Sequence, residues 1–235
     1  MNDGSIIGVG FGLIFVLFGA LVIGGIVLAV RMHKKRQAAL AAWAARHGWT
    51  SAGSVSGLER RWSSPPFSLG HSRRAAEVLV GDFHGQAALS CTYSYTTGSG
   101  KSQSTHSFHV VSMRLPAPLP WLQLTPEGVG ASVAKFFGGQ DIEFESSAFN
   151  DAWRVKAPPG QYAHDFIHPR MMERLLQPDA VGRCVTVEGQ DILLWVGGAQ
   201  RLEYIDIYLN LLLGVINQIP RQLWLKAGHD PLAQS

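Results

Sequence analysis

One uncharged apolar run near the N-terminus constrains this chain more than any other feature. Residues 6–30 (IIGVGFGLIFVLFGALVIGGIVLAV) are 25 residues without a charged side chain. As an α-helix this run would be roughly 37 Å long, which exceeds the hydrocarbon thickness of about 30 Å in a bilayer. The sequence therefore predicts a transmembrane helix over residues 6–30 that crosses with some tilt.

The flanking charges favour an anchor over a cleaved signal peptide and set its direction. The segment before the run carries Asp3 without Lys or Arg, and no small-x-small cleavage site is present. After the run come Arg31, Lys34, Lys35 and Arg36. Because positive charge stays inside, we expect a single-pass cell-membrane protein with its N-terminus outside and its C-terminal domain cytoplasmic. The same four cations are expected to contact anionic lipid headgroups of the bilayer.

Small residues recur at four-residue spacing within the apolar run. Gly8 and Gly12 form a GxxxG motif, and Ala20 and Gly24 form a second small pair. Such spacing lets helix backbones approach closely in a membrane. We expect these residues to mediate helix–helix contact, either in a homodimer or with a protein partner, although glycine is also common in membrane helices for other reasons.

Composition divides the chain into four parts and excludes some function classes. We expect an outer tip and transmembrane helix (1–30), a basic juxtamembrane helix (31–48), a soluble α+β domain (49–225) and a flexible tail (226–235). The formal net charge is only +3, so charge alone does not indicate nucleic-acid binding. Cys91 and Cys184 are too few and too distant for a disulfide framework or a metal site, and are expected to be buried and reduced.

Alternation of apolar and polar residues predicts an antiparallel meander, with a tight turn at His84-Gly85. Its strands are expected at residues 77–83, 86–97, 105–115 and 121–124, and the prolines Pro116, Pro118 and Pro120 are expected to end the third. Further along we expect a short helix (131–137), short strands (142–145 and 153–156), a helix broken near Pro169 (162–176), a hairpin (183–187 and 192–196) and a long helix (202–223).

The predicted fold class is therefore α+β: an N-terminal transmembrane helix, an antiparallel sheet with packed helices, and a long C-terminal helix. A small barrel capped by the last helix, as in pleckstrin-like domains, is an alternative.

Two motifs suggest chemistry that their context does not support. Residues 98–102 (GSGKS) resemble part of a phosphate-binding loop, but Tyr95 stands where the first glycine is needed and the segment joins two strands. His164, Asp165 and His168 have the outline of a zinc-hydrolase helix. Pro169 biases His168 away from helical geometry, so His164 and His168 are only weak metal candidates, and no cofactor is expected.

Other candidate residues have plain structural explanations. His106 and His109 are three apart in a strand, so they face opposite sides and do not form a pair. No G-x-S-x-G nucleophile elbow occurs. Residues 116–120 (PAPLP) could offer a polyproline ligand, but a connector between strands is the simpler interpretation.

Several phrases between residues 142 and 220 resemble a family of bacterial, actinobacterial-like, single-pass membrane-anchored proteins of unknown function. They are FES (144–146), FN (149–150), WRV (153–155), Ala163, HPRMM (168–172) and LL (175–176). A basic helix that ends in a W-A-x-x-x-G-W-like phrase (43–49) adds to the likeness. The resemblance implies an N-terminal membrane span and a mixed domain, and implies no catalytic residue.

The leading functional prediction is a membrane-tethered binding or scaffolding module, because no catalytic set is evident. One alternative is a membrane-bound hydrolase that uses His164, Asp165 and His168; a pocket into which these side chains converge would favour it. Another is an accessory subunit of a membrane complex.

Overall fold

The computed structural model describes residues 3–126 and 141–233, with side chains from residue 18 onward. The chain divides into two compact units, Met1–Trp43 and Ala44–Ser235. The first unit contains most of helix α1 (Asp3–His47). The short helix expected at residues 131–137 lies outside the described part, and the surroundings of Gly8 and Gly12 in α1 are not described.

Helix α1 forms where a helix was expected, but its assignment as a membrane span is overturned for the described residues. None of the helices in that part is long and apolar enough to cross a membrane. The fold class is corrected to α+β, with no membrane-spanning helix among the described residues. The expected single-pass cell-membrane location, N-terminus outside and domain cytoplasmic, is corrected with it.

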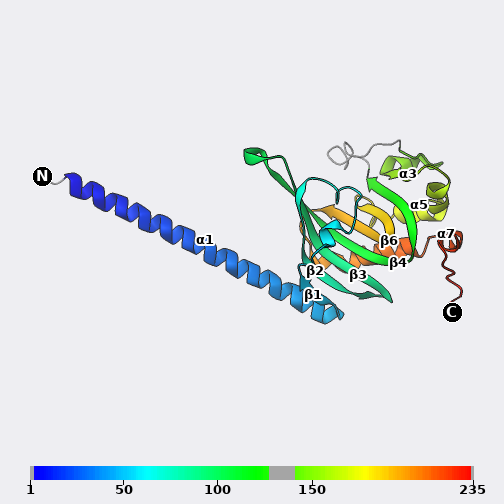
Figure 1. The fold of residues 1–235 in the computed structure, drawn as a ribbon, viewed down its shortest axis with the longest axis horizontal. Helices are drawn as coiled ribbons and strands as arrows, with labels where there is room; N and C mark the ends of the chain where they lie inside the picture. Colours follow the sequence, from blue (N-terminus) through cyan, green and yellow to red (C-terminus); the bar gives the residue numbers. More distant parts are fainter. Residues whose placement is uncertain (1–2, 127–140, 234–235) are drawn as a thin grey trace. The chain divides into compact units, whose positions relative to one another are not determined.

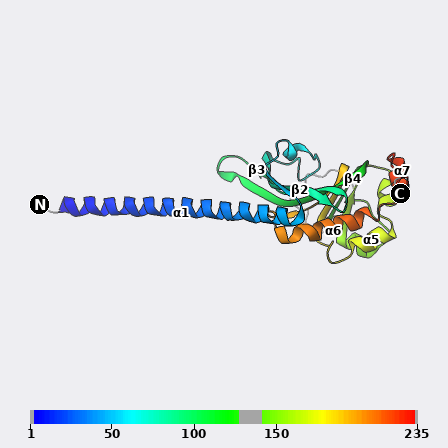
Figure 2. The ribbon, with the colours of Figure 1, turned by 90° about the horizontal axis from the view of Figure 1, so that it is seen from below.

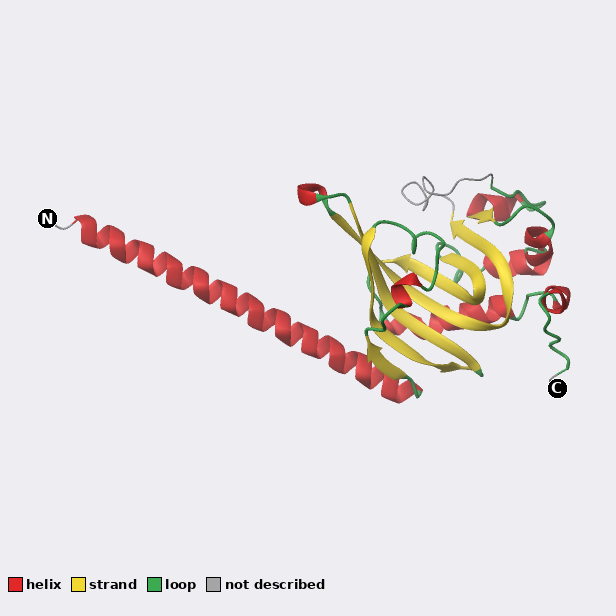
Figure 3. Ribbon diagram, viewed as in Figure 1, coloured by secondary structure: helices red, strands yellow, loops and turns green. Residues whose placement is uncertain are grey.

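The second unit is built on one antiparallel sheet (Figures 1 and 3). The described residues form a six-stranded sheet in the order β1-β2-β3-β4-β5, and β6 also pairs with β4. The strands are β1 (Thr50–Gly53), β2 (His71–Phe83), β3 (Gln86–Thr97), β4 (Ser104–Pro126), β5 (Trp153–Lys156) and β6 (Cys184–Gly197). The predicted meander corresponds to β2, β3 and β4, and the predicted strand at residues 142–145 does not form.

Strand β4 continues through the prolines that were expected to end it. Pro116, Pro118 and Pro120 alternate with buried residues and are themselves exposed. The register between β4 and β6 shifts between Arg114 and Leu119, so the prolines occupy an irregular part of the ladder where few hydrogen bonds are lost. Strand β4 therefore keeps its alternation of buried and exposed side chains, although its three prolines have no backbone N–H group.

Strand β6 is continuous where a hairpin was predicted. The turn-like sequence at residues 188–191 lies inside the strand, and Gly189 has a φ of +61°. Gly189 is paired with Leu119 at the register shift. The left-handed conformation of Gly189 therefore accommodates the register shift between β4 and β6 and does not reverse the direction of the chain.

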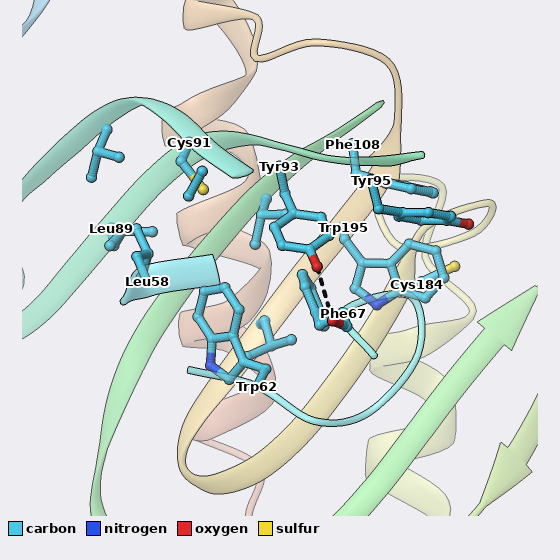
Figure 4. Close-up of a cluster of buried hydrophobic side chains, with 14 of the residues drawn as sticks. Leu58, Trp62, Phe67, Leu89, Cys91, Tyr93, Tyr95, Phe108, Cys184 and Trp195 are labelled. Atoms are coloured by element: carbon cyan, nitrogen blue, oxygen red, sulfur yellow. Dashed lines mark hydrogen bonds between the residues drawn. The ribbon is translucent and has the colours of Figure 1, made fainter. Parts of the chain in front are cut away.

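One face of the sheet is covered by the loop at residues 54–70, which contains the short helix η1 (Leu58–Arg60). Figure 4 shows its aromatic side chains packed against those of β3, β4 and β6. The buried cluster comprises Leu58, Trp62, Phe67, Leu69, Ala75, Val78, Leu89, Cys91, Tyr93, Tyr95, Phe108, Val110, Cys184, Leu193 and Trp195. The Tyr93 hydroxyl donates to the Phe67 carbonyl at 2.8 Å, so this polar group is satisfied inside the apolar cluster.

Two carboxylates of β6 hold this loop in place. Asp191 accepts hydrogen bonds from the Arg61 guanidinium at 2.7 Å and from the Trp62 indole at 3.0 Å. Glu188 accepts from the hydroxyls of Ser63 and Ser64, each at 2.6 Å. Charge-assisted bonds of this length are stronger than neutral ones, so they fix the loop over the cluster.

Helix α6 (Ile205–Ile216) packs on the other face of the sheet, against β4 and β6 (Figure 2). The long helix predicted over residues 202–223 is instead interrupted. It consists of η3 (Leu202–Tyr204), α6 and α7 (Arg221–Lys226), with Pro220 at the N-cap of α7. The remaining helices are α3 (Ser147–Ala152), α4 (Tyr162–Phe166) and α5 (Pro169–Leu175). The predicted break near Pro169 separates α4 from α5.

Both thiols should be unreactive in the folded protein. Burial raises the pKa of Cys91 to about 12 and raises that of Cys184 further, so neither forms the reactive thiolate near about pH 8. We expect no reaction with Ellman's reagent until guanidinium unfolds the chain, when both thiols should react. Rapid reaction of either thiol in native protein would contradict the packing of the cluster.

Candidate functional site

One hollow of the second unit lies where the proline segment of β4 meets α4 and α7. We call it the α4–α7 pocket. Its volume is about 400 Å³, within the range of roughly 300–1,000 Å³ that is usual for small-molecule sites. It is lined by Pro118, Leu119, Pro120, Gln161, Tyr162, Asp165, Leu223, Lys226 and Ala227. Its walls are mainly apolar, with a few polar groups that could orient a ligand.

Each wall follows from its local sequence. The alternation of β4 places Pro118 and Pro120 on its exposed side. Gly160 has a φ of +123° and is followed by Gln161, the N-cap of α4, so Tyr162 is the first residue of the helix. Helix α7 starts after Pro220 and buries Leu223. Three separate chain segments therefore form the pocket.

The Tyr162 hydroxyl is the unusual polar group of this pocket. It is covered from solvent and has no hydrogen-bond partner among the described residues. Burial raises the pKa of Tyr162 above its ordinary value of 10.0, so the hydroxyl remains a donor throughout the physiological range. An unsatisfied buried polar group costs about 1–3 kcal/mol, so this hydroxyl lowers the stability of the wall that it belongs to.

An ion pair occupies the rim. Lys226 Nζ lies 3.1 Å from an oxygen of Asp165, and the lysine side chain is largely exposed whereas the aspartate is mostly covered. The pair adds little stability because exposed ion pairs contribute about 0–1 kcal/mol. Its effect on the pocket is electrostatic: the positive charge at the rim is already compensated.

The structure does not bring the histidine motif together. The His164 ring packs on Phe144 with 5.1 Å between centroids, and Asp165 pairs with Lys226. His168 is the N-cap of α5, and its Nε2 donates to the Gln218 carbonyl at 2.8 Å. Within residues 3–126 and 141–233, no group of three metal-ligating side chains could hold an ion. The three residues thus have separate partners.

His106 and His109 face opposite sides of the sheet. His106 stacks on Tyr95 at 5.0 Å, whereas His109 lies under α6 and is 1% exposed. His109 Nε2 is 3.1 Å from the Ser90 hydroxyl, which also accepts from Gln200 Nε2 at 2.7 Å. This Ser–His pair is sealed from solvent, so it is a structural network and not a nucleophile.

The remaining candidate residues are on or near strands and on α1. The GSGKS segment connects β3 to β4 and contains η2 (Gly100–Ser102), with strands on both sides. Arg31, Lys34 and Lys35 are exposed on α1 at spacings that place them on one helix face, and Arg36 is half-buried. Lipid contact by these cations stays a prediction. Helix–helix contact through Gly8, Gly12, Ala20 and Gly24, all of which lie in α1, also stays a prediction.

Sequence reasoning missed Tyr162. A tyrosine at the start of a short helix carries no signal of its own, because its importance depends on the absence of a partner in three dimensions. The only hint was the Pro-Pro-Gly sequence at residues 158–160, which fixes where α4 begins.

Comparison with known proteins shows a shared fold. No protein-family model matches the chain, and no curated protein matches it. A solved structure that is similar is the crystal structure of the mycobacterial trehalose monomycolate transport factor A, TtfA. The match has a TM-score of 0.54 and 15% sequence identity, and covers 76% of this chain and 91% of that chain. The neighbour is from an actinobacterium, in line with the actinobacterial resemblance in the sequence, and at this identity the likeness concerns the fold alone.

The histidine motif should be structural and independent of zinc. His168→Ala is expected to lower the free energy of unfolding by about 1 kcal/mol, because the Gln218 carbonyl loses its donor. Neither Zn²⁺ nor EDTA should shift the Tm of the wild type or the variant, since only a bound ion stabilises by mass action. Thermal unfolding with and without each additive measures this. A zinc-dependent rise in Tm that His168→Ala removes would contradict it.

Proposed function

We propose that this protein is a binding module that takes the apolar part of a small amphiphilic molecule into the α4–α7 pocket. The observation that carries this proposal is a mainly apolar pocket of about 400 Å³ with an ion pair at its rim. Ligand sites typically combine apolar walls with a small number of polar groups that orient the ligand. Pro118, Leu119 and Leu223 supply the walls, and Asp165 and Lys226 supply the polar groups.

The shared fold supports a role in transport. The solved neighbour is named as a transport factor for trehalose monomycolate. We extend this to the present chain as part of the proposal: an accessory, membrane-associated factor that holds an amphiphile for a transport process. The hydrolase alternative loses support because His164, Asp165 and His168 each have a separate structural partner.

A second contact is proposed for the basic segment of α1. Arg31, Lys34 and Lys35 are exposed, and Arg36 follows them. Clustered cations near an anionic bilayer each contribute about 1 kcal/mol of attraction. This segment would hold the protein at an anionic lipid surface, where an amphiphilic ligand is also found.

Filling the pocket should abolish ligand uptake. N-phenyl-1-naphthylamine, an uncharged apolar dye, is expected to bind the full chain and fluoresce. Ala227→Trp, which places an indole in the pocket, should weaken dye binding by about tenfold or more. Ala148→Trp is the matched control, because Ala148 is exposed on α3 and does not line the pocket. Equal dye binding by both variants would show that the dye, and the proposed ligand, bind elsewhere.

Removing two of the clustered cations should weaken binding to anionic vesicles. Lys34→Gln with Lys35→Gln should reduce affinity for phosphatidylglycerol vesicles by about 30-fold, from about 1 kcal/mol per charge. The control is Arg60→Gln with Lys101→Gln, which removes two exposed cations of the second unit. Vesicle cosedimentation at low salt measures both. If the control loses as much affinity, binding depends on net charge and the cluster has no special role.

A further inference from the structure

A second hollow lies along the same two helices as the α4–α7 pocket, and we call it the Arg170 hollow. Its volume is about 580 Å³. It is lined by residues of α4 and α7, among them Asp165 and Arg221, and by Arg170 of α5. Asp165 also lines the α4–α7 pocket, and its hydrogen bond with Lys226 joins α4 to α7 at 3.1 Å. The two hollows therefore adjoin at this ion pair.

The charges around the Arg170 hollow leave one cation without a counterion. Asp165 is paired with Lys226, and Arg221 is paired with Asp230 at nitrogen–oxygen distances of 3.0 to 3.2 Å. Arg170 is exposed, and its guanidinium forms no ion pair with another described residue. Each of the two carboxylates thus already has a cation, and the positive charge of Arg170 remains available to a ligand.

Other acidic side chains of this region belong to a different hollow. Glu143 and Glu145 line that hollow, and it shares only His164 and His168 with the Arg170 hollow. The negative side chain that does line the Arg170 hollow is Asp165, which Lys226 compensates. An anion in the Arg170 hollow therefore meets an unpaired cation, and the carboxylate that lines the hollow is already neutralised.

We infer that the amphiphile carries a negatively charged head group, which lies in the Arg170 hollow and pairs with Arg170 while the apolar chain occupies the α4–α7 pocket. This inference rests on the proposed function, because the pocket must hold the chain. A guanidinium suits such a head group, since its planar N–H donors match the oxygens of a carboxylate or phosphate. The Asp165–Lys226 pair then lies where the head group joins the chain.

The test measures how much each of two ligands depends on Arg170. Decanoate and its methyl ester share one acyl chain, but only decanoate is charged at neutral pH. Each displaces N-phenyl-1-naphthylamine from the full chain, at concentrations below those at which it forms micelles. Arg170→Gln should weaken decanoate by about fivefold, or about 1 kcal/mol for an exposed ion pair. It should leave the affinities for the ester and the dye unchanged, because neither is charged.

Two further variants separate the charge of Arg170 from other effects. Arg74→Gln makes the same change at an exposed position of β2 that lines neither hollow, and should leave the affinity for decanoate unchanged. Arg170→Lys keeps the positive charge and should retain most of the affinity that Arg170→Gln loses. Neither Arg170 variant should lower the Tm of the ligand-free protein, since Arg170 has no ion pair to lose among the described residues.

The remaining outcomes contradict separate steps. If the dye binds and Arg170→Gln weakens both ligands equally, or neither, the head group does not pair with Arg170, and the inference is wrong while the proposed pocket function stands. An equal loss of decanoate affinity in Arg74→Gln would show a response to net charge alone, which also overturns the inference. If the dye does not bind, or Ala227→Trp leaves its binding unchanged, the proposed function fails and the inference fails with it.

Discussion

β4 pairs with β6 along both halves of its length, from Phe108 opposite Gly197 to Leu124 opposite Val185, and the rest of the second unit depends on this long ladder. Its two faces are used differently because successive side chains of a strand point to opposite sides. Phe108 and Val110 join the aromatic cluster under the loop at residues 54–70. His109, between them, faces α6 and lies 5.2 Å from the Tyr208 ring. One strand pair thus supplies two cores, and the far end of β4 supplies a wall of the pocket.

The two cores differ in how polar groups are satisfied. Under the loop, Asp191 is 6% exposed and accepts hydrogen bonds from Arg61 and Trp62, so its buried charge is compensated as the low-dielectric interior requires. Under α6, Ser90, His109 and Gln200 form a hydrogen-bonded network. Four buried polar atoms among the described residues have no hydrogen-bond partner: Gln86 Oε1, Trp121 Nε1, the Tyr162 hydroxyl and Arg183 Nε. None of them belongs to the polar groups that link the sheet to the loop at residues 54–70, so the contacts that hold this loop are fully paired.

The features that could be predicted from the sequence are those that depend on residues close together in the chain. Strands β2 and β3 were predictable because period-two alternation and the turn at residues 84–85 are local signals. The break at Pro169 was equally local. Strand β4 was predicted too short, because Pro116 was expected to end it. A proline in a strand removes one backbone N–H donor, and the strand can continue past it. The contacts of Asp191 and Glu188 with the loop at residues 54–70 join residues more than 120 positions apart, and no local pattern indicates them. The pocket could not be predicted for the same reason, because its three walls come from segments that are far apart in the sequence.

The prolines of β4 also shape the pocket. The pairing of β3 with β4 stops at Met113, and the pairing of β5 with β4 starts at Gln123. Pro118 and Pro120 lie in the stretch between these two points and line the α4–α7 pocket together with residues of α4 and α7. A proline ring fixes its own φ and has little side-chain freedom. A wall built from two such rings therefore keeps its shape, whereas flexible side chains at the same positions could turn into the hollow and fill it.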